Sequence, residues 1–235
     1  MAAAGAFPHT SLRGLTTFAP PRQAALVELL TIGPGILLAV NARKVADADP
    51  TTIALTATHL GYPDGVGAVL ALRRLGIPAT RLPGADLWLR ILERYVGERS
   101  FYLVGGTQEV VGIVAKKLLL MYPGIRLRYR DGYLRPGDRE RLQEDLRLHQ
   151  PDMVFVAMGS PRQEILMASL YEAHPAVYLG LGGSFDVFAG MKERAPRLVQ
   201  QMGLEWAYRL IREPGRIRRL PGIIRFAGRL VTGRL

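Results

Sequence analysis

Short segments, most of them almost entirely apolar, alternate along this chain with longer segments that have a helical pattern. The strand-like segments cover residues 36–41, 52–57, 100–104, 126–130, 153–158 and 176–181. The helical segments cover residues 22–30, 42–48, 65–75, 84–96, 107–121, 138–149 and 162–174, and the first 21 residues read as irregular. Strands that are apolar on both faces belong in a parallel sheet covered by helices on both sides. With right-handed crossovers, the sequence predicts an α/β fold with a doubly wound, Rossmann-like parallel sheet.

Composition narrows the class of protein further. The chain has 235 residues and no cysteine, so it is long enough for a full core but has no disulfide or thiolate metal site. Its four histidines lie far apart, and none has a metal-binding spacing. No segment reaches the roughly 18 apolar residues of a spanning helix, and no signal peptide is recognisable. We therefore expect a cytoplasmic protein without a metal or another cofactor.

Charge is concentrated at the carboxyl-terminal end. The net charge is +11, and residues 192–235 hold 11 of the 31 Lys and Arg but only three of the 20 Asp and Glu. The character of the sequence also changes here, because prolines and glycines break it into short helical pieces. We predict a core over residues 1–193 and a helical, basic appendage over residues 194–235. A local basic excess indicates an anionic partner such as a membrane surface, a nucleic acid or a diphosphate.

The end of the appendage has the pattern of a helix lying on a membrane. One face would carry Ile217, Leu220, Ile224, Ala227 and Val231, and the opposite face Arg218, Arg225 and Arg229. This pattern predicts an interfacial helix on anionic lipid. The alternative is a helix that packs on the protein's own core. An exposed appendage face also leaves self-association into a homo-oligomer open.

In a doubly wound sheet, ligands bind beyond the carboxyl ends of the strands. Gly105 and Gly106 end one strand-like segment and open a helix, an arrangement suited to a phosphate or to a structural turn. Gln163 and Glu164 begin another helix after a strand. A carboxylate there suits a capping role, whereas the amide of Gln163 suits a sugar hydroxyl or a base edge. Asp186 follows the last strand and is a candidate for helix capping or for binding a ribose or uracil.

Asp64 is the strongest candidate for a general base. It lies in the sequence PDGVG, where the alternative is a turn or helix-capping aspartate. An inverting sugar transfer needs one carboxylate to deprotonate the acceptor hydroxyl. Asp47 and Asp49 form a DxD pattern, but we expect them to end a surface helix before Pro50 rather than to bind a metal. Without a metal, arginines must neutralise the leaving diphosphate.

The order of the motifs resembles that of the WecG/TagA/CpsF family of bacterial glycosyltransferases. The matching segments span residues 37–219 and read AVNA, PDGVG, RLPGADL, FYLVGGT, RDGY, MGSPRQE, LGGSFDVFAG, RAP and GLEWAYRLIREPGRIRR. The resemblance implies an inverting, metal-independent transfer from a UDP-sugar, typically UDP-N-acetylmannosamine or its uronic acid. It implies an acceptor N-acetylglucosamine on undecaprenyl diphosphate, at the inner face of the cell membrane, in cell-surface polysaccharide or teichoic-acid synthesis.

The same resemblance implies roles for individual residues. Asp64 matches the catalytic base. Substrate-pocket positions are matched by Asn41, Arg81, Gln163 and Asp186. Arg209, Arg216 and Arg219 match the arginines of the family's carboxyl-terminal appendage. This appendage is expected to fold over the active site and to touch the membrane.

Two departures from the family pattern concern the substrate. The family has Thr two residues before the Asn, where this chain has Ala39, and a hydroxyl contact to substrate would be missing. The stretch ATHLGYPDG before Asp64 also differs from the usual run of small apolar residues. We therefore expect a transferase whose donor sugar or rate differs from the family pattern.

Two other functions would also suit an α/β chain with a basic tail. A dinucleotide-binding enzyme needs a glycine fingerprint after the first strand, where this chain has Asn41, Ala42, Arg43 and Lys44. A protein that binds nucleic acid or a nucleotide through its basic tail would have aromatic residues interleaved with the arginines. Residues 210–235 contain a single aromatic residue, Phe226. We therefore expect no nucleic-acid partner.

Overall fold

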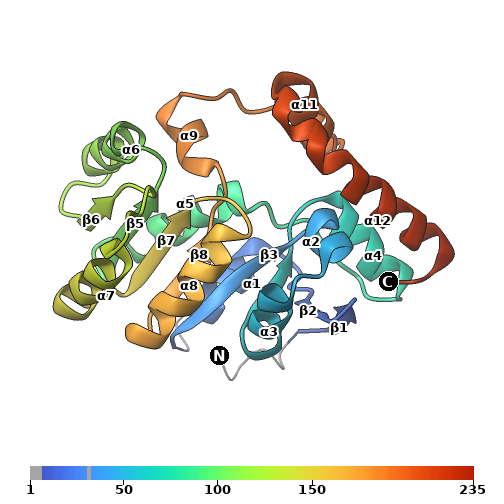
Figure 1. Ribbon diagram of the computed structural model, residues 1–235, viewed down its shortest axis with the longest axis horizontal. Coiled ribbons are helices and arrows are strands. Elements are labelled where there is room, and N and C mark those ends of the chain that lie inside the picture. Colours follow the sequence, from blue (N-terminus) through green and yellow to red (C-terminus); the bar gives the residue numbers. More distant parts are fainter. Residues whose placement is uncertain (1–6, 31–32) are drawn as a thin grey trace.

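The computed structural model describes residues 7–30 and 33–235, apart from the side chains of residues 214, 216 and 219 (Figure 1). Its centre is a six-stranded sheet in the order β4-β3-β8-β7-β5-β6, and every neighbouring pair is parallel. The strands are β3 (Gly35–Val40), β4 (Leu60–Pro63), β5 (Ser100–Gly105), β6 (Arg126–Arg130), β7 (Met153–Ala157) and β8 (Val177–Gly180). The predicted α/β class with a doubly wound parallel sheet is confirmed.

Each inner strand sends alternate side chains to two different cores. In β3, Leu37 packs with one apolar cluster and its neighbours Ile36 and Leu38 pack with the other. The helices α1 (Gln23–Leu29), α5 (Gly84–Tyr95) and α6 (Gln108–Met121) cover the first cluster. The second lies under α3 (Pro50–Thr58), α7 (Asp138–His149) and α8 (Arg162–Ala173), which stand in front of the sheet in Figure 1. Burial on both faces explains why these strands are almost wholly apolar.

The strand predicted over residues 52–57 is wrong, because these residues lie in the helix α3. Asp49 caps this helix, accepting a hydrogen bond from the backbone nitrogen of Thr52 at 2.9 Å, and Pro50 occupies its first turn. These start signals outweigh the strand propensity of the β-branched residues that follow. The second strand is instead β4, in which all four residues are buried.

The amino-terminal segment forms an antiparallel hairpin of β1 (His9–Leu12) and β2 (Leu15–Phe18), where the sequence indicated irregular structure. The hairpin packs beside the edge strand β4. A Cβ atom on Gly61 would lie 2.3 Å from the carbonyl oxygen of Thr16, so this approach requires glycine. The two-residue turn at Arg13 and Gly14, both with positive φ, closes the hairpin.

The chain after β8 is helical. It forms α9 (Ser184–Ala189), α10 (Arg197–Gln201), α11 (Glu205–Arg212), a 3-10 helix (Pro214–Arg219) and α12 (Leu220–Thr232). Figure 1 shows α11 beyond the carboxyl ends of the strands and α12 running beside α2 (Ala42–Asp47) and α4 (Val66–Arg74). Within residues 7–30 and 33–235, no helix is both long and apolar enough to cross a membrane.

One face of α12 is fixed to the core. Phe226 is 4% exposed and packs in a cluster with residues of α2 and α4. A Cβ atom on Gly67 would lie 3.1 Å from the Phe226 ring, so the glycine admits the aromatic side chain. The opposite face leaves Ile224 and Val231 exposed. The helix therefore packs on the protein's own core and still presents an apolar face outward.

Candidate active site

Asp64 lies at the carboxyl edge of the sheet, directly after β4. Its backbone nitrogen donates to the carbonyl oxygen of Val40 in β3 at 2.8 Å, which ties the Asp64 loop to the neighbouring strand. Its Oδ1 accepts a hydrogen bond from the backbone nitrogen of Gly84 at 3.4 Å. A Cβ atom on Gly84 would lie 2.9 Å from the hydroxyl of Tyr62, so glycine is needed at this position. The carboxylate is thus held by backbone groups between β4 and α5.

The pKa of Asp64 is raised above its ordinary value. Burial is the main cause, and the negative charge of Glu205 in α11 adds to it. The hydrogen bond from Gly84 and the positive charges of Lys44 and Arg81 act in the opposite direction. A carboxylate with a raised pKa is a stronger base, which suits proton abstraction from a hydroxyl group.

Asn41 follows β3, the strand next to Asp64. Its side-chain oxygen accepts a hydrogen bond from the backbone nitrogen of Lys44 at 3.1 Å and so caps α2. Asn41 and Asp64 therefore stand at neighbouring strand ends. Arg81 is partly buried in the segment before α5, close enough for its charge to act on Asp64. The structure brings these three predicted residues to one edge of the sheet.

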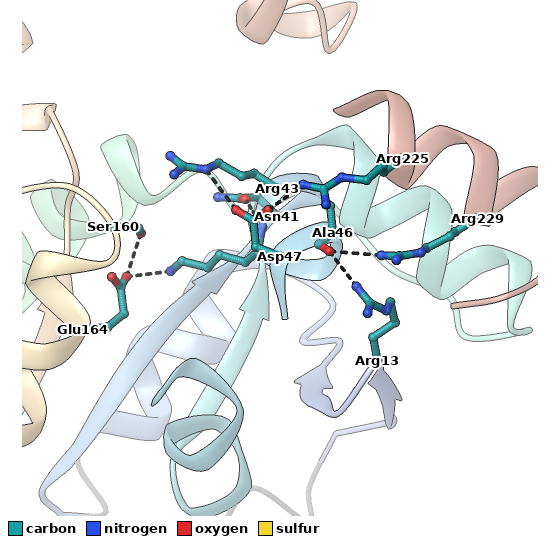
Figure 2. Close-up of polar contacts among 10 residues, drawn as sticks. Arg13, Asn41, Arg43, Ala46, Asp47, Ser160, Glu164, Arg225 and Arg229 are labelled. Atoms are coloured by element: carbon teal, nitrogen blue, oxygen red, sulfur yellow. Dashed lines mark hydrogen bonds and ion pairs between the residues drawn. The ribbon is translucent and has the colours of Figure 1, made fainter. Parts of the chain in front are cut away.

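A buried ion pair supports this edge from below. The Nζ of Lys44 lies 2.8 Å from Oε1 of Glu164, and the two side chains are 6% and 0% exposed. The hydroxyl of Ser160 and the amide nitrogen of Gln163 donate to the same carboxylate oxygen, at 2.9 and 3.0 Å. Figure 2 shows this network reaching from α2 to the loop after β7. Glu164 is therefore an ion-paired core residue in the first turn of α8, where a carboxylate is favourable, and α8 has no side-chain capping hydrogen bond.

Gln163 is also mostly buried, and its amide oxygen binds two backbone nitrogens. It accepts hydrogen bonds from Gly159 at 3.1 Å and from Gly182 at 2.8 Å. These contacts join the loops after β7 and β8. Asp186 lies in the first turn of α9, where its carboxylate is 3.4 Å from Nζ of Lys192.

Gly105 and Gly106 allow the end of β5 to approach the backbone at the end of β7. A Cβ atom on Gly105 would lie 2.3 Å from the carbonyl oxygen of Ala157, and the nitrogen of Gly106 donates to the same oxygen at 3.2 Å. Thr107 then caps α6. Beside this turn lies an open cavity of about 610 Å³, lined by Thr107, Gln108, Asp131, Tyr133, Arg135, Pro136, Asp138 and Arg141. The close backbone contact therefore explains why glycine is required at this turn, and the turn also borders a polar cavity.

The appendage brings charged residues to the Asp64 edge. Arg209 in α11 lies 3.2 Å from Glu205, and both side chains are partly exposed. The backbone of Arg216 and Arg219 belongs to the 3-10 helix, whereas their side chains lie outside the described part of the structure. Arg194, just before α10, binds Asp86 in the first turn of α5 through two nitrogens, at 2.5 and 2.8 Å. The contact between Arg194 and Asp86 thus links the appendage to α5, beside Asp64.

The sequence model of the glycosyl transferase WecG/TagA/CpsF family matches residues 21–235. The chain belongs to this family. Among solved structures, an inactive β4 tetramer of a split-gene transketolase is similar over 89% of this chain and 62% of that chain, with 17% identity and a TM-score of 0.28. A likeness this weak carries no argument about function.

This WecG/TagA/CpsF family member has site residues that the sequence did not single out. They are Lys44, whose charge acts on Asp64, and Glu205, which pairs with Arg209. Lys44 is the cation that pairs with the buried Glu164, but nothing in the sequence indicates which cation this glutamate would bind. Glu205 lies four residues before Arg209, and this spacing is a sequence signal for a helical ion pair.

The carboxylates of the DxD pattern make structural contacts in this family member. Asp49 caps α3, and Asp47 pairs with Arg43 and Arg225 at 3.3 and 3.4 Å (Figure 2). Across the part of the chain that the structure describes, no three acidic or histidine side chains gather closely enough to hold a metal ion.

Proposed function

We propose that this protein is an inverting glycosyltransferase that moves a sugar from a nucleoside diphosphate to a lipid-linked acceptor during synthesis of a cell-surface polysaccharide. Family membership supports the reaction class. The observation that carries the proposal is Asp64, a carboxylate with a raised pKa at the ligand-binding edge of a doubly wound sheet. The positive charges of Lys44 in α2 and of Arg81 in the segment before α5 act on this carboxylate, and the appendage brings Glu205 to it.

In this mechanism Asp64 takes the proton from the acceptor hydroxyl. The acceptor oxygen forms a bond to the anomeric carbon of the donor, on the face opposite the diphosphate. The bond between that carbon and the diphosphate oxygen breaks, and UDP leaves with the electron pair. Arg209, Arg216 and Arg219 neutralise the charge that develops on the diphosphate, so the reaction needs no metal.

The strand order supports a donor that lies along the carboxyl edge of the sheet. In that order β3, which ends beside Asn41, and β5, which ends at Gly105, are three strand spacings apart, roughly 14 Å. An extended nucleoside diphosphate sugar is long enough to bridge this span. The sugar would lie near Asn41, Arg81 and Asp186, and Gln163 would hold the loops around it. The nucleotide would reach the turn at Gly105 and Gly106 and the adjoining polar cavity.

The donor is UDP-N-acetylmannosamine, its uronic acid or a related sugar, and the acceptor is N-acetylglucosamine on undecaprenyl diphosphate. The motif order supports this choice. Ala39 is 9% exposed and packs in the core cluster on one face of β3. It supplies no hydroxyl, so a donor that depends on this contact would bind less tightly here.

Residues 194–235 form an appendage that holds the enzyme on the inner face of the cell membrane. Exposed apolar side chains at Ile217, Ile224 and Val231, which are 62–76% exposed, support this placement. Replacing these three residues by Asp should abolish sedimentation with anionic vesicles while leaving the affinity for UDP unchanged. Sedimentation of the triple variant as strong as that of the wild type would contradict the placement.

The activity is tested by measuring UDP release. Purified protein is mixed with UDP-N-acetylmannosamine, a lipid-linked N-acetylglucosamine diphosphate and a chelator. Release that depends on the acceptor supports the reaction class, the donor and metal independence together. Release only with another UDP-sugar would change the donor, and no release with any UDP-sugar would overturn the proposal.

A further inference from the structure

Glu205 is the first residue of α11, where the appendage contacts the loop that carries Asp64. Two residues earlier, Gly203 packs against Val66, and a Cβ atom on Gly203 would lie 3.1 Å from the Cβ of Val66. Val66 in turn is two residues after Asp64. Gly203 has a φ of +74°, so the close contact and the backbone conformation both favour glycine. The Asp64 loop and the start of α11 are therefore in direct contact.

The charge of Glu205 acts on two arginines of the appendage. Its carboxylate lies 3.2 Å from Arg209, and the side chains are 18% and 22% exposed. Its charge also reaches Arg194, whose pKa is raised mainly by its hydrogen bonds to Asp86 and further by Glu205. Arg194 is bound to Asp86 through two nitrogens, whereas Arg209 is the arginine that Glu205 contacts directly.

We propose that Glu205 is a positioning residue that holds Arg209 against α11 in the resting enzyme and releases it to the diphosphate when the donor binds. This inference rests on the proposed function, since it needs an anionic donor. A diphosphate carries more negative charge than a single carboxylate and competes for the same guanidinium group. Donor binding thus exchanges one ion pair of Arg209 for another.

The exchange changes the surroundings of Asp64. The groups that face Asp64 are Tyr62 from β4, Lys44 from α2, Arg81 from the segment before α5, the backbone nitrogen of Gly84 in α5, and Glu205 from α11. Once Arg209 has left, the charge of Glu205 is less compensated, and it raises the pKa of Asp64 further. The general base therefore becomes stronger when the donor is in place, which couples donor binding to proton abstraction.

The test compares Glu205→Gln with the wild type in the full-length protein. UDP binding is measured by titration calorimetry without acceptor. Because the uncharged amide of this variant no longer competes for Arg209, UDP should bind about two- to five-fold more tightly, the range expected for a partly exposed ion pair. The acidic limb of the kcat profile should move to lower pH, since the charge that raises the pKa of Asp64 is gone.

Glu193→Gln is the matched control. Glu193 pairs with Arg212 at 2.8 Å on the exposed surface of the same region, with side chains 75% and 61% exposed. Its removal should change neither the UDP affinity nor the pH profile.

A second variant tests the inference from the other partner. Arg209→Gln leaves Glu205 uncompensated, so UDP should bind more weakly and the acidic limb should move to higher pH. If Glu205→Gln does not fold, the direction in which the acidic limb of the kcat profile moves in Arg209→Gln tests the role of Glu205.

Two results would overturn this inference without affecting the proposed function. The first is UDP binding by Glu205→Gln that is unchanged or weaker than that of the wild type. The second is an acidic limb of the kcat profile that stays in place or moves to lower pH in Arg209→Gln. A wild-type protein that binds no UDP would overturn the proposed function together with the inference.

Discussion

The ammonium group of Lys44 lies 2.8 Å from the carboxylate of Glu164, and the two side chains are almost completely buried. The pair joins the helix after β3 to the helix after β7. It fixes the relative position of two loops that the proposed mechanism uses.

Removing one partner of this pair should be costly. Lys44→Met leaves the carboxylate of Glu164 buried without its cation and should lower the free energy of unfolding by about 3–5 kcal/mol. Urea denaturation measures the loss. The double variant Lys44→Met/Glu164→Gln removes both charges and should recover much of the stability. A loss below about 1 kcal/mol in the single variant would mean that the pair is not buried in solution.

The attachment of α12 should depend on Phe226. Phe226→Ala removes a side chain that is 4% exposed and should destabilise the docked helix by about 3–5 kcal/mol. Hydrogen exchange should show faster exchange throughout α12, with the central strands unchanged. Ile224→Ala, on the exposed face of the same helix, is the control and should change stability by no more than about 0.5 kcal/mol. Equal exchange in the two variants would contradict the docking.

Asp64 should reduce stability at neutral pH. Its pKa in the folded protein is raised, so the folded state disfavours the ionised form. The neutral carboxyl group of Asp64 stabilises the fold fully at pH values below the pKa that Asp64 has in the unfolded chain. This stabilisation is lost as the pH rises through the pKa that Asp64 has in the folded protein. Asp64→Asn should therefore unfold at higher temperature than the wild type at pH 7, and the difference should shrink as the pH is lowered. A less stable Asp64→Asn protein at pH 7 would show that the charge is well solvated or paired.

The contact between Arg194 and Asp86 should hold the start of the appendage. Arg194→Lys keeps the charge but loses the two-nitrogen geometry, which should cost about 1 kcal/mol because both side chains are partly exposed. Limited proteolysis should then cleave residues 190–196 faster, while Arg197→Lys should leave the rate unchanged. No change with Arg194→Lys would mean that other contacts hold this segment.

Much of the fold could be predicted from the sequence because four of the strands, β3, β5, β7 and β8, carry mostly apolar residues on both faces. The pattern failed over residues 52–57, where Thr and Ile resemble a strand but Asp49 and Pro50 start a helix. It also missed β4, since four residues containing Gly61 and Pro63 have little strand propensity. This strand forms because β3 and β2 pack against it.

The site was predicted less completely, for a physical reason. Positions at strand ends can be read from the alternation of elements where the strand is recognised, as for Asn41. Asp64 is instead indicated by the sequence PDGVG, because the strand before it is not recognisable. Partnerships between distant residues cannot be read in this way. The pairing of Lys44 with Glu164, and the approach of Glu205 to Asp64, depend on how loops from different parts of the chain meet.

UDP release with and without acceptor, for the wild type and Asp64→Asn, tests the central claim most directly. The account predicts acceptor-dependent release by the wild type in the presence of chelator. It predicts no turnover by Asp64→Asn, although calorimetry should show that this variant still binds UDP with nearly unchanged affinity. Turnover by Asp64→Asn at a rate close to that of the wild type would contradict the assignment of Asp64 as the general base.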